Sequence, residues 1–132
     1  MSEHRLTFVA LNVSDLDRSL DFYRDILGVP VRETAHDAEL DDPWFGGRHA
    51  ACSWTDGAYL HFAIYPSREP ERPTSKSAQI GFNVDDFDAV HRRLANTGVE
   101  IVQVPRTEPW GRTARYLDPD DNIVSITERA SD

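Results

Sequence analysis

The sequence is poor in cysteine and in positive charge, and both shortages narrow the range of functions. Cys52 is the single cysteine among 132 residues, so the chain has no disulfide framework and no cysteine metal cluster. Lys76 is the one lysine, and 23 acidic residues against 14 basic ones give a net charge of −9. This charge disfavours nucleic acids and anionic membrane surfaces as partners.

The sequence also lacks long apolar runs. No run approaches the ~20 residues that span a membrane, and Met1–Arg5 shows no apolar segment of the kind found in signal peptides. We therefore expect a cytoplasmic protein that binds neither membranes nor nucleic acid. At 132 residues the chain is long enough for a sizeable core, and we expect residues 1–132 to form one domain.

The chain contains two copies of one sequence pattern. Residues 9–17 read VALNVSDLD, and residues 80–88 match them with IGFNVDDFD at an offset of 80 − 9 = 71. Each copy is an apolar strand ending in Asn-Val, then an acidic helix start, then a helix that closes at Gly28 or Gly98. Two copies of this length indicate a duplicated supersecondary unit rather than a solenoid. Equivalent units usually build a site between or beneath them, so residues at paired positions should face one cavity.

Apolar periodicity predicts a βαβββ order in the first copy. Residues 6–13 alternate as a strand, and Ser14 is the expected N-cap of the helix that follows. Three further strands are expected at 29–34, 50–55 and 58–65, the last two as a hairpin across the two-residue turn Asp56-Gly57. The helix carries one apolar stripe, formed by Leu16, Leu20, Tyr23 and Leu27.

The second copy repeats this order after a linker. Residues 67–77 contain Pro70 and Pro73 among charged residues, which is typical of a linker. Strands are predicted at 78–84, 99–104, 111–117 and 122–128, and a helix at 85–97. We therefore predict an α+β fold, with module one at about 5–66 and module two at about 78–128. The second helix should turn Phe87, Val90 and Leu94 inward.

Alternation along the first strand of each copy separates an apolar face from a mixed one. The apolar faces should pack against the helices, and they are formed by Val9, Leu11 and Val13 and by Ile80, Phe82 and Val84. The opposite faces should line the cavity, and they are formed by Phe8, Ala10 and Asn12 and by Gln79, Gly81 and Asn83.

Two motifs carry a resemblance to a known family. Residues 12–28 read NVSDLDRSLDFYRDILG, and Pro109-Trp-Gly-Arg112 precedes the segment YLDPDDN at 116–122. Over almost the whole chain, the sequence resembles the glyoxalase/bleomycin-resistance/extradiol-dioxygenase superfamily, also called vicinal oxygen chelate. One departure is Asp121, where the family usually has glycine; a left-handed backbone is often needed there, and Asp tolerates it better than most residues.

The resemblance implies two tandem βαβββ modules that curl a mixed β-sheet into a cup. In metal-using members the ligands come from the first and last strands of both modules. Those positions map onto Phe8 and His61 in the first module and onto Gln79 and Ser125 in the second. We expect His61 and Ser125 to be equivalent, because each is the third residue of a matching segment (YLHF and IVSI).

These four residues do not form a usual metal site. Phe8 cannot bind a metal, Ser125 is a poor ligand, and Gln79 offers at best a neutral oxygen. One imidazole does not hold Zn²⁺, Ni²⁺ or Fe²⁺, which require about three or four protein ligands. We therefore expect no metal and no cofactor. The alternative is a shifted metal site that combines His61 with Glu108 or His49.

Each of the other candidate site residues could have either a functional role or a purely structural one. His61 could be a general base or only a hydrogen-bonded cavity residue. Arg112 and Arg115 could clamp an anionic ligand, or could only balance nearby carboxylates. Five aromatic residues could line a ligand pocket, or could belong to the core or to a dimer contact: Trp44, Phe45, Trp54, Trp110 and Tyr116.

The leading hypothesis from the sequence is a metal-free binding protein that resembles the bleomycin-resistance branch of the family. It would hold an aromatic or planar small molecule by stacking, with polar groups fixing its orientation, and we expect a homodimer. The rival is an enzyme, either a lyase, isomerase or oxygenase with an atypical metal site or a metal-free catalyst using His61. A third reading is a module that binds another protein through its aromatic loops.

Overall fold

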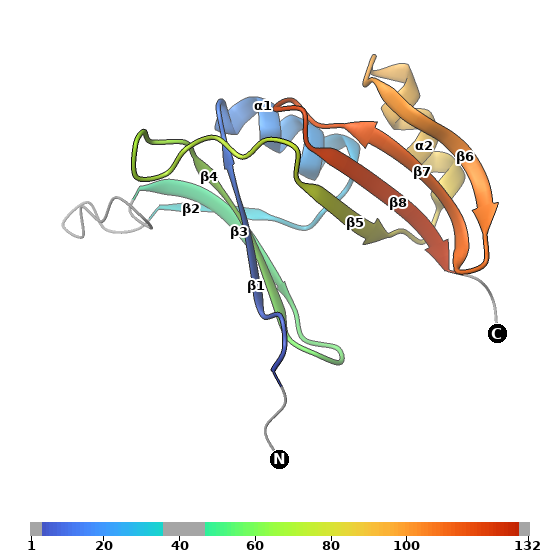
Figure 1. Cartoon of the computed structure of the whole chain (residues 1–132), viewed down its shortest axis with the longest axis horizontal. Helices are drawn as coiled ribbons and strands as arrows, with labels where there is room; N and C mark the ends of the chain where they lie inside the picture. The colour runs from blue at the N-terminus through green and yellow to red at the C-terminus, as the bar shows by residue number, and fades with distance from the viewer. Residues whose placement is uncertain (1–3, 36–46, 130–132) are drawn as a thin grey trace.

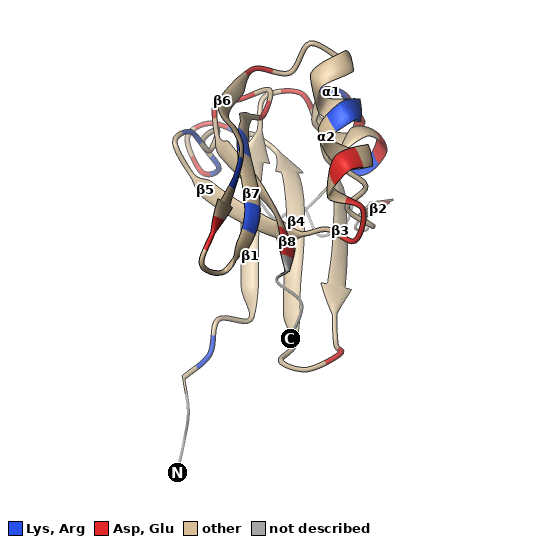
Figure 2. Ribbon diagram, turned by 90° about the vertical axis from the view of Figure 1, so that its right-hand side faces the viewer, with Lys and Arg blue, Asp and Glu red and all other residues tan. Residues whose placement is uncertain are grey.

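The chain folds into two four-stranded sheets, with helices on the same side of both (Figures 1 and 2). The computed structural model describes residues 4–35 and 47–129. The first half contains β1 (Phe8–Val13), α1 (Leu16–Leu20), the π-helical η1 (Asp21–Ile26), β2 (Arg32–Ala35), β3 (Arg48–Trp54) and β4 (Leu60–Pro66). The second half contains β5 (Gln79–Asn83), α2 (Phe87–Asn96), β6 (Ile101–Glu108), β7 (Gly111–Leu117) and β8 (Ile123–Arg129). Two tandem βαβββ modules are thereby confirmed.

Both sheets have the same topology. Their strand orders are β1-β4-β3-β2 and β5-β8-β7-β6. In each module the first strand pairs in parallel with the last, and the remaining pairs are antiparallel. No described helix is long and apolar enough to cross a membrane.

The helices bury the apolar face of each sheet. The expected stripe of the first helix is buried completely, with Leu16, Leu20, Tyr23 and Leu27 at most 5% exposed. Phe87, Val90 and Leu94 of α2 are buried as predicted. The two modules share one core, because the ring of Tyr23 lies 6.0 Å from that of Phe62 and 6.4 Å from that of Phe82.

The first helix begins one residue later than expected. Asp15 is its N-cap, and its carboxylate accepts a hydrogen bond from the backbone N–H of Arg18. The prediction that Ser14 caps this helix was wrong because Ser14 binds the other module instead. Its hydroxyl donates to Oδ1 of Asp120 at 2.5 Å, and its backbone N–H donates to Oδ2 at 3.1 Å.

Asp118 stands at the centre of the contact between the modules. Its carboxylate is 4% exposed and accepts a hydrogen bond from the hydroxyl of Tyr23 at 2.5 Å. It also accepts from the backbone N–H groups of Asp120 and Asn122 and from the Asn122 side chain. Burial, together with the charge of Asp118, raises the pKa of Tyr23 far above its usual range, so the phenol stays a donor. Asn122 in turn binds Ala78 and Ser75, which fixes the end of the linker.

The turn that contains Asp118 also accounts for the residue type at position 121. Its φ is 66°, the left-handed conformation that glycine usually supplies, which confirms the expectation drawn from the sequence. The turn between β3 and β4 differs from expectation: Trp54 pairs with Leu60, so five residues rather than two connect the strands. The Asp56-Gly57 pair lies within this longer loop.

We expect the Tyr23–Asp118 hydrogen bond to contribute measurably to stability. Tyr23→Phe should lower the free energy of unfolding by roughly 1.5–3 kcal/mol, because it leaves a buried carboxylate with one donor fewer. Urea unfolding monitored by fluorescence would measure this change. Tyr59→Phe is the matched control: Tyr59 is 50% exposed, and its change should stay within about 0.5 kcal/mol. Equal effects of the two substitutions would contradict the role given to Asp118.

Candidate ligand-binding site

We call the side of each sheet that faces away from the helices its open face. On the first module this face carries Phe8 and Ala10 of β1, with His61 and Ala63 beside them on β4. Phe8 is 42% exposed, whereas the helix-facing Leu11 is 2% exposed. The alternation along β1 therefore orients its side chains as the sequence predicted.

An aromatic pair occupies one end of this face. The rings of Phe8 and His61 stack with their centroids 5.6 Å apart and their planes 13° apart. On the other side of His61, its Nδ1 lies 2.7 Å from the hydroxyl of Ser53, which is 3.4 Å from the hydroxyl of Tyr59. The imidazole is thus held between a ring and a hydroxyl, at the two first-module positions where metal-using relatives are expected to place ligands.

A row of small side chains follows. Ala10 pairs with Ala63, and Ala63 pairs with Ala51 of β3. Paired residues of neighbouring strands lie on the same face, so three methyl groups form a low, apolar floor beside the Phe8–His61 pair. The middle one, on Ala63, is fully buried, so a flat guest would contact this floor through the partly exposed Ala10 and Ala51. The row ends at the exposed Arg32, which pairs with Ala51.

The corresponding row of the second module is polar. Gly81 of β5 pairs with Ser125 of β8, Ser125 pairs with Arg115 of β7, and Arg115 pairs with Gln103 of β6. Gln79 lies on the same face of β5, two residues before Gly81. The two modules thus share a backbone plan but present different chemistry on their open faces.

The strand register corrects one expectation. Phe8 pairs with His61, but Gln79, which is equivalent to Phe8, pairs with Ile123. The equivalent of His61 is therefore Ile123 and not Ser125, which lies two residues further along β8. Side chains alternate between the two faces along β8, so Ser125, two residues after Ile123, still lies on the open face. Ser125 is not, however, the residue opposite Gln79.

Arg112 and Tyr116 lie on the helix side rather than on the open face. The Arg112 guanidinium contacts Asp88 at 3.1 Å and Glu128 at 2.6 Å, and it lies 4.4 Å from the centre of the Phe87 ring. Tyr116 is fully buried and its hydroxyl lies 2.6 Å from Nδ1 of His91; burial raises its pKa to about 12. Of the two readings given for each residue, the structure matches the structural one: Arg112 balances nearby carboxylates and Tyr116 belongs to the core, with both strand positions toward α2.

The predicted aromatic residues separate into three groups. Trp110 lies in the turn between β6 and β7 and is 60% exposed. Trp54 packs against the core, with its ring 6.4 Å from that of Phe82. Trp44 and Phe45 lie outside the described residues. The structure therefore leaves Phe8 and Trp110 as the exposed aromatic rings of the predicted set within its described part.

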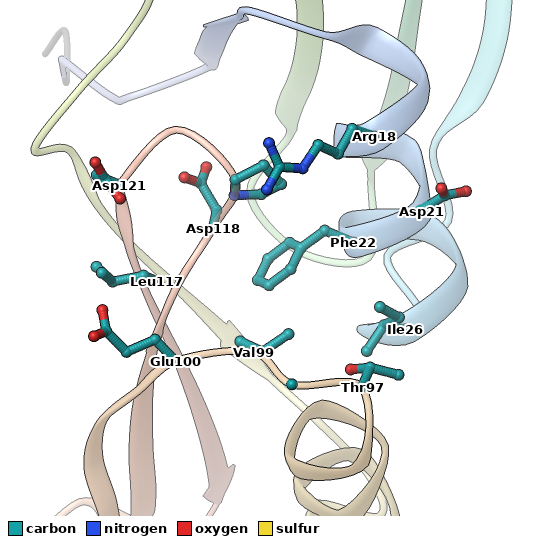
Figure 3. Close-up of a pocket in the computed structure, with 12 residues that line it drawn as sticks. Arg18, Asp21, Phe22, Ile26, Thr97, Val99, Glu100, Leu117, Asp118 and Asp121 are labelled. Atoms are coloured by element: carbon teal, nitrogen blue, oxygen red, sulfur yellow. The ribbon is translucent and has the colours of Figure 1, made fainter.

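A separate cavity of about 340 Å³ lies on the helix side, between η1 and the second module (Figure 3). Phe22, Ile26 and Val99 point into it. The charged side chains of the lining are mainly acidic, with Asp21, Glu100, Asp118 and Asp121 against the single Arg18. Sequence reasoning missed this cavity because its walls come from distant segments. Its charge distinguishes it from the open faces, since it disfavours anionic ligands.

Comparison with known proteins decides the family. A model of the Glyoxalase/Bleomycin resistance protein/Dioxygenase superfamily matches residues 5–126. The chain belongs to this superfamily. TnmS3, an antibiotic binding protein from Streptomyces sp. CB03234, is similar to it in structure, with a TM-score of 0.68, 27% identity, and coverage of 98% of this chain and 99% of that one.

Two other proteins are also similar to this chain. The glutathione transferase FosA of Serratia marcescens is 27% identical over 126 residues, which cover 92% of this chain and 78% of FosA. A glyoxalase/dioxygenase from Nostoc punctiforme has a TM-score of 0.69 at 24% identity, covering 96% of this chain and 92% of that one. The latter supports the fold alone. The chain is thus similar both to an antibiotic binding protein and to an enzyme.

The described residues contain no group of three or more His, Cys, Asp or Glu side chains that could hold a metal ion. His61 pairs with Ser53, which is four residues from His49 along β3, roughly 13 Å at ~3.3 Å per residue. Glu108 lies in the other sheet, where it binds Arg106. The shifted metal sites considered for this superfamily member are therefore not assembled by these residues.

The Ser53–His61 pair has part of the geometry of a nucleophile and its base. In a serine nucleophile site, a third group orients the histidine. Within the described part of the chain, His61 contacts the hydroxyl of Ser53 and the apolar ring of Phe8, and no described carboxylate orients the imidazole. The pair can donate and accept hydrogen bonds to a ligand without forming a complete catalytic triad.

We expect the purified protein to contain no stoichiometric Ni, Zn, Mn or Fe, because Phe8 replaces a ligand with an apolar ring and Ser125 offers only a hydroxyl. Elemental analysis after purification without chelator would test this expectation. His61→Ala is the informative variant. One equivalent of metal in the parent protein that disappears in this variant would contradict it.

Proposed function

We propose that this protein binds a planar or aromatic small molecule on its open faces, without a metal ion. The observation that carries the proposal is the stacked Phe8–His61 pair beside the row of Ala10, Ala63 and Ala51. At a position where metal-using relatives need a donor atom, the chain has an exposed aromatic ring. A ring of this kind binds through contact area rather than through coordination.

The rest of the site supports the same function. His61 and Ser53 supply hydrogen-bonding groups next to the apolar floor, and ligand pockets typically combine a few polar groups with an apolar lining. The relationship to the antibiotic binding protein TnmS3 supports a natural product as the ligand class. The rival proposal is an enzyme, which the relationship to FosA supports. Against it stand the missing orienting group of His61 and the absence of a three-ligand cluster among the described residues.

Phe8→Ala should weaken ligand binding by about 5- to 150-fold, because loss of one stacking ring costs ~1–3 kcal/mol in a desolvated site. The ligand would first be found by thermal-shift screening of aromatic natural products and then titrated by calorimetry. Ile101→Ala is the matched control, since Ile101 is exposed but pairs with the helix-facing Tyr116.

Arg112→Ala provides the opposite test. We expect it to leave the affinity unchanged, because Arg112 is bound to Asp88 and Glu128 beside α2. If Arg112→Ala abolished binding while Phe8→Ala had no effect, the stacking mechanism would be wrong. An enzyme acting on an anionic substrate would then be the better explanation.

We further propose that the protein is a homodimer in which open faces of two chains form a composite cavity. Several exposed apolar side chains support this, including Leu6 at 71%, Val104 at 67% and Trp110 at 60%. Val104 lies on β6, an edge strand, and exposed apolar edges promote association. Light scattering at micromolar concentration should give about twice the 15.0 kDa mass of one chain. A mass equal to one chain would reject the dimer.

A further inference from the structure

We infer that the second module's open face binds an oxygen acceptor on the ligand, namely a carboxylate or phenolate, through Gln103, Arg115 and Ser125. This inference rests on the proposed function and specifies the ligand class. We call these three residues the donor row. Gln103 was not among the residues predicted from the sequence.

The donor row is continuous across three strands. Gln103 of β6 pairs with Arg115 of β7, and Arg115 pairs with Ser125 of β8. Arg115 and Ser125 share one face, since directly paired residues of antiparallel strands point the same way. A register shift between Ile101 and Gln103 brings Gln103, rather than Val102, opposite Arg115. An amide, a guanidinium and a hydroxyl are thus aligned at one level of the sheet.

The next residue along this row is glycine, which leaves room for the Ser125 side chain. Gly81 pairs with Ser125, and a Cβ at position 81 would lie 2.8 Å from the Ser125 hydroxyl oxygen. Any larger residue would displace the Ser125 side chain from the row. The face therefore keeps one end of the row open for a guest.

The donors of this row have no acceptor in the described part of the chain. The side-chain nitrogen of Gln103 is buried and makes no hydrogen bond. Arg115 is exposed and takes part in no described ion pair, although acidic residues outnumber basic ones 23 to 14 in the chain. By contrast, Arg48, Arg106 and Arg112 each bind a described carboxylate.

The chemistry of the row selects the ligand group. A guanidinium binds a carboxylate or phenolate through charge-assisted hydrogen bonds, and a buried donor without a partner is costly until an acceptor arrives. The equivalent row of the first module consists of Ala10, Ala63 and Ala51, which offer only apolar contact, and ends at the exposed Arg32 of β2. In the proposed composite cavity, the alanine row would hold the aromatic ring of the ligand, and the donor row would hold the ligand's acidic group.

Three naphthalene probes test this inference, because they share one ring system and differ in charge: 2-naphthoate, 2-naphthamide and 2-naphthylmethylammonium. Calorimetry should show that 2-naphthoate binds at least roughly 10-fold more tightly than the ammonium compound. Arg115→Gln should remove most of this preference, and Gln103→Leu should reduce it. Arg92→Gln is the matched control, since it removes an exposed arginine of α2 with the same change in net charge.

The outcomes separate the two proposals. Equal binding of all three probes, or equal losses in Arg115→Gln and Arg92→Gln, would overturn the donor row while leaving the aromatic-binding function intact. Failure of every probe to bind would contradict the aromatic-binding function, and the donor row would fail with it. Normal circular dichroism and thermal unfolding of Arg115→Gln would confirm that the variant is folded.

Discussion

The arrangement of the two modules depends on one buried carboxylate. Asp118 accepts hydrogen bonds from Tyr23 in the first module and from its own turn in the second. A buried carboxylate is costly unless its oxygens are satisfied, so the turn and Tyr23 must come together as a unit. Asp120 adds the contact to Ser14, and Asn122 adds the contacts to the linker. Since each sheet is attached to this cluster, the positions of both open faces follow from it.

The contrast between the two open faces is the feature with the most direct bearing on function. At the level of Ala10, the open face of the first module presents three alanines and Arg32, whereas the equivalent level of the second module presents Gly81, Ser125, Arg115 and Gln103. Figure 2 shows charged residues on the helices and on β6 to β8, while β1 and β4 are free of them. Duplication preserved the backbone and allowed the two faces to diverge. We propose that one face now supplies apolar contact and the other hydrogen-bond donors.

Local sequence patterns predicted the features that depend on neighbouring residues, namely which side of each helix is buried and which face of each strand is open. The spacing of Leu16, Leu20, Tyr23 and Leu27 located the buried stripe, and alternation along β1 and β5 located the open faces. Long-range contacts were beyond such patterns. Ser14 is a good N-cap by type, but its hydroxyl is held by Asp120, which is 106 residues away in the sequence. Arg112 and Arg115 differ by three positions on β7 and so lie on opposite faces, but only the contacts with Asp88 and Phe87 reveal that Arg112 is the one that faces α2.

The most direct test of the account is to locate the bound ligand by NMR. Adding 2-naphthoate to isotope-labelled protein should shift the backbone amide signals of Ala10, Ala51 and Ser125 on the open faces. The signals of Ile26, Thr97 and Glu100, which line the acidic cavity on the helix side, should stay in place. Shifts confined to that cavity, with the open-face signals unchanged, would contradict the assignment of the open faces as the binding site.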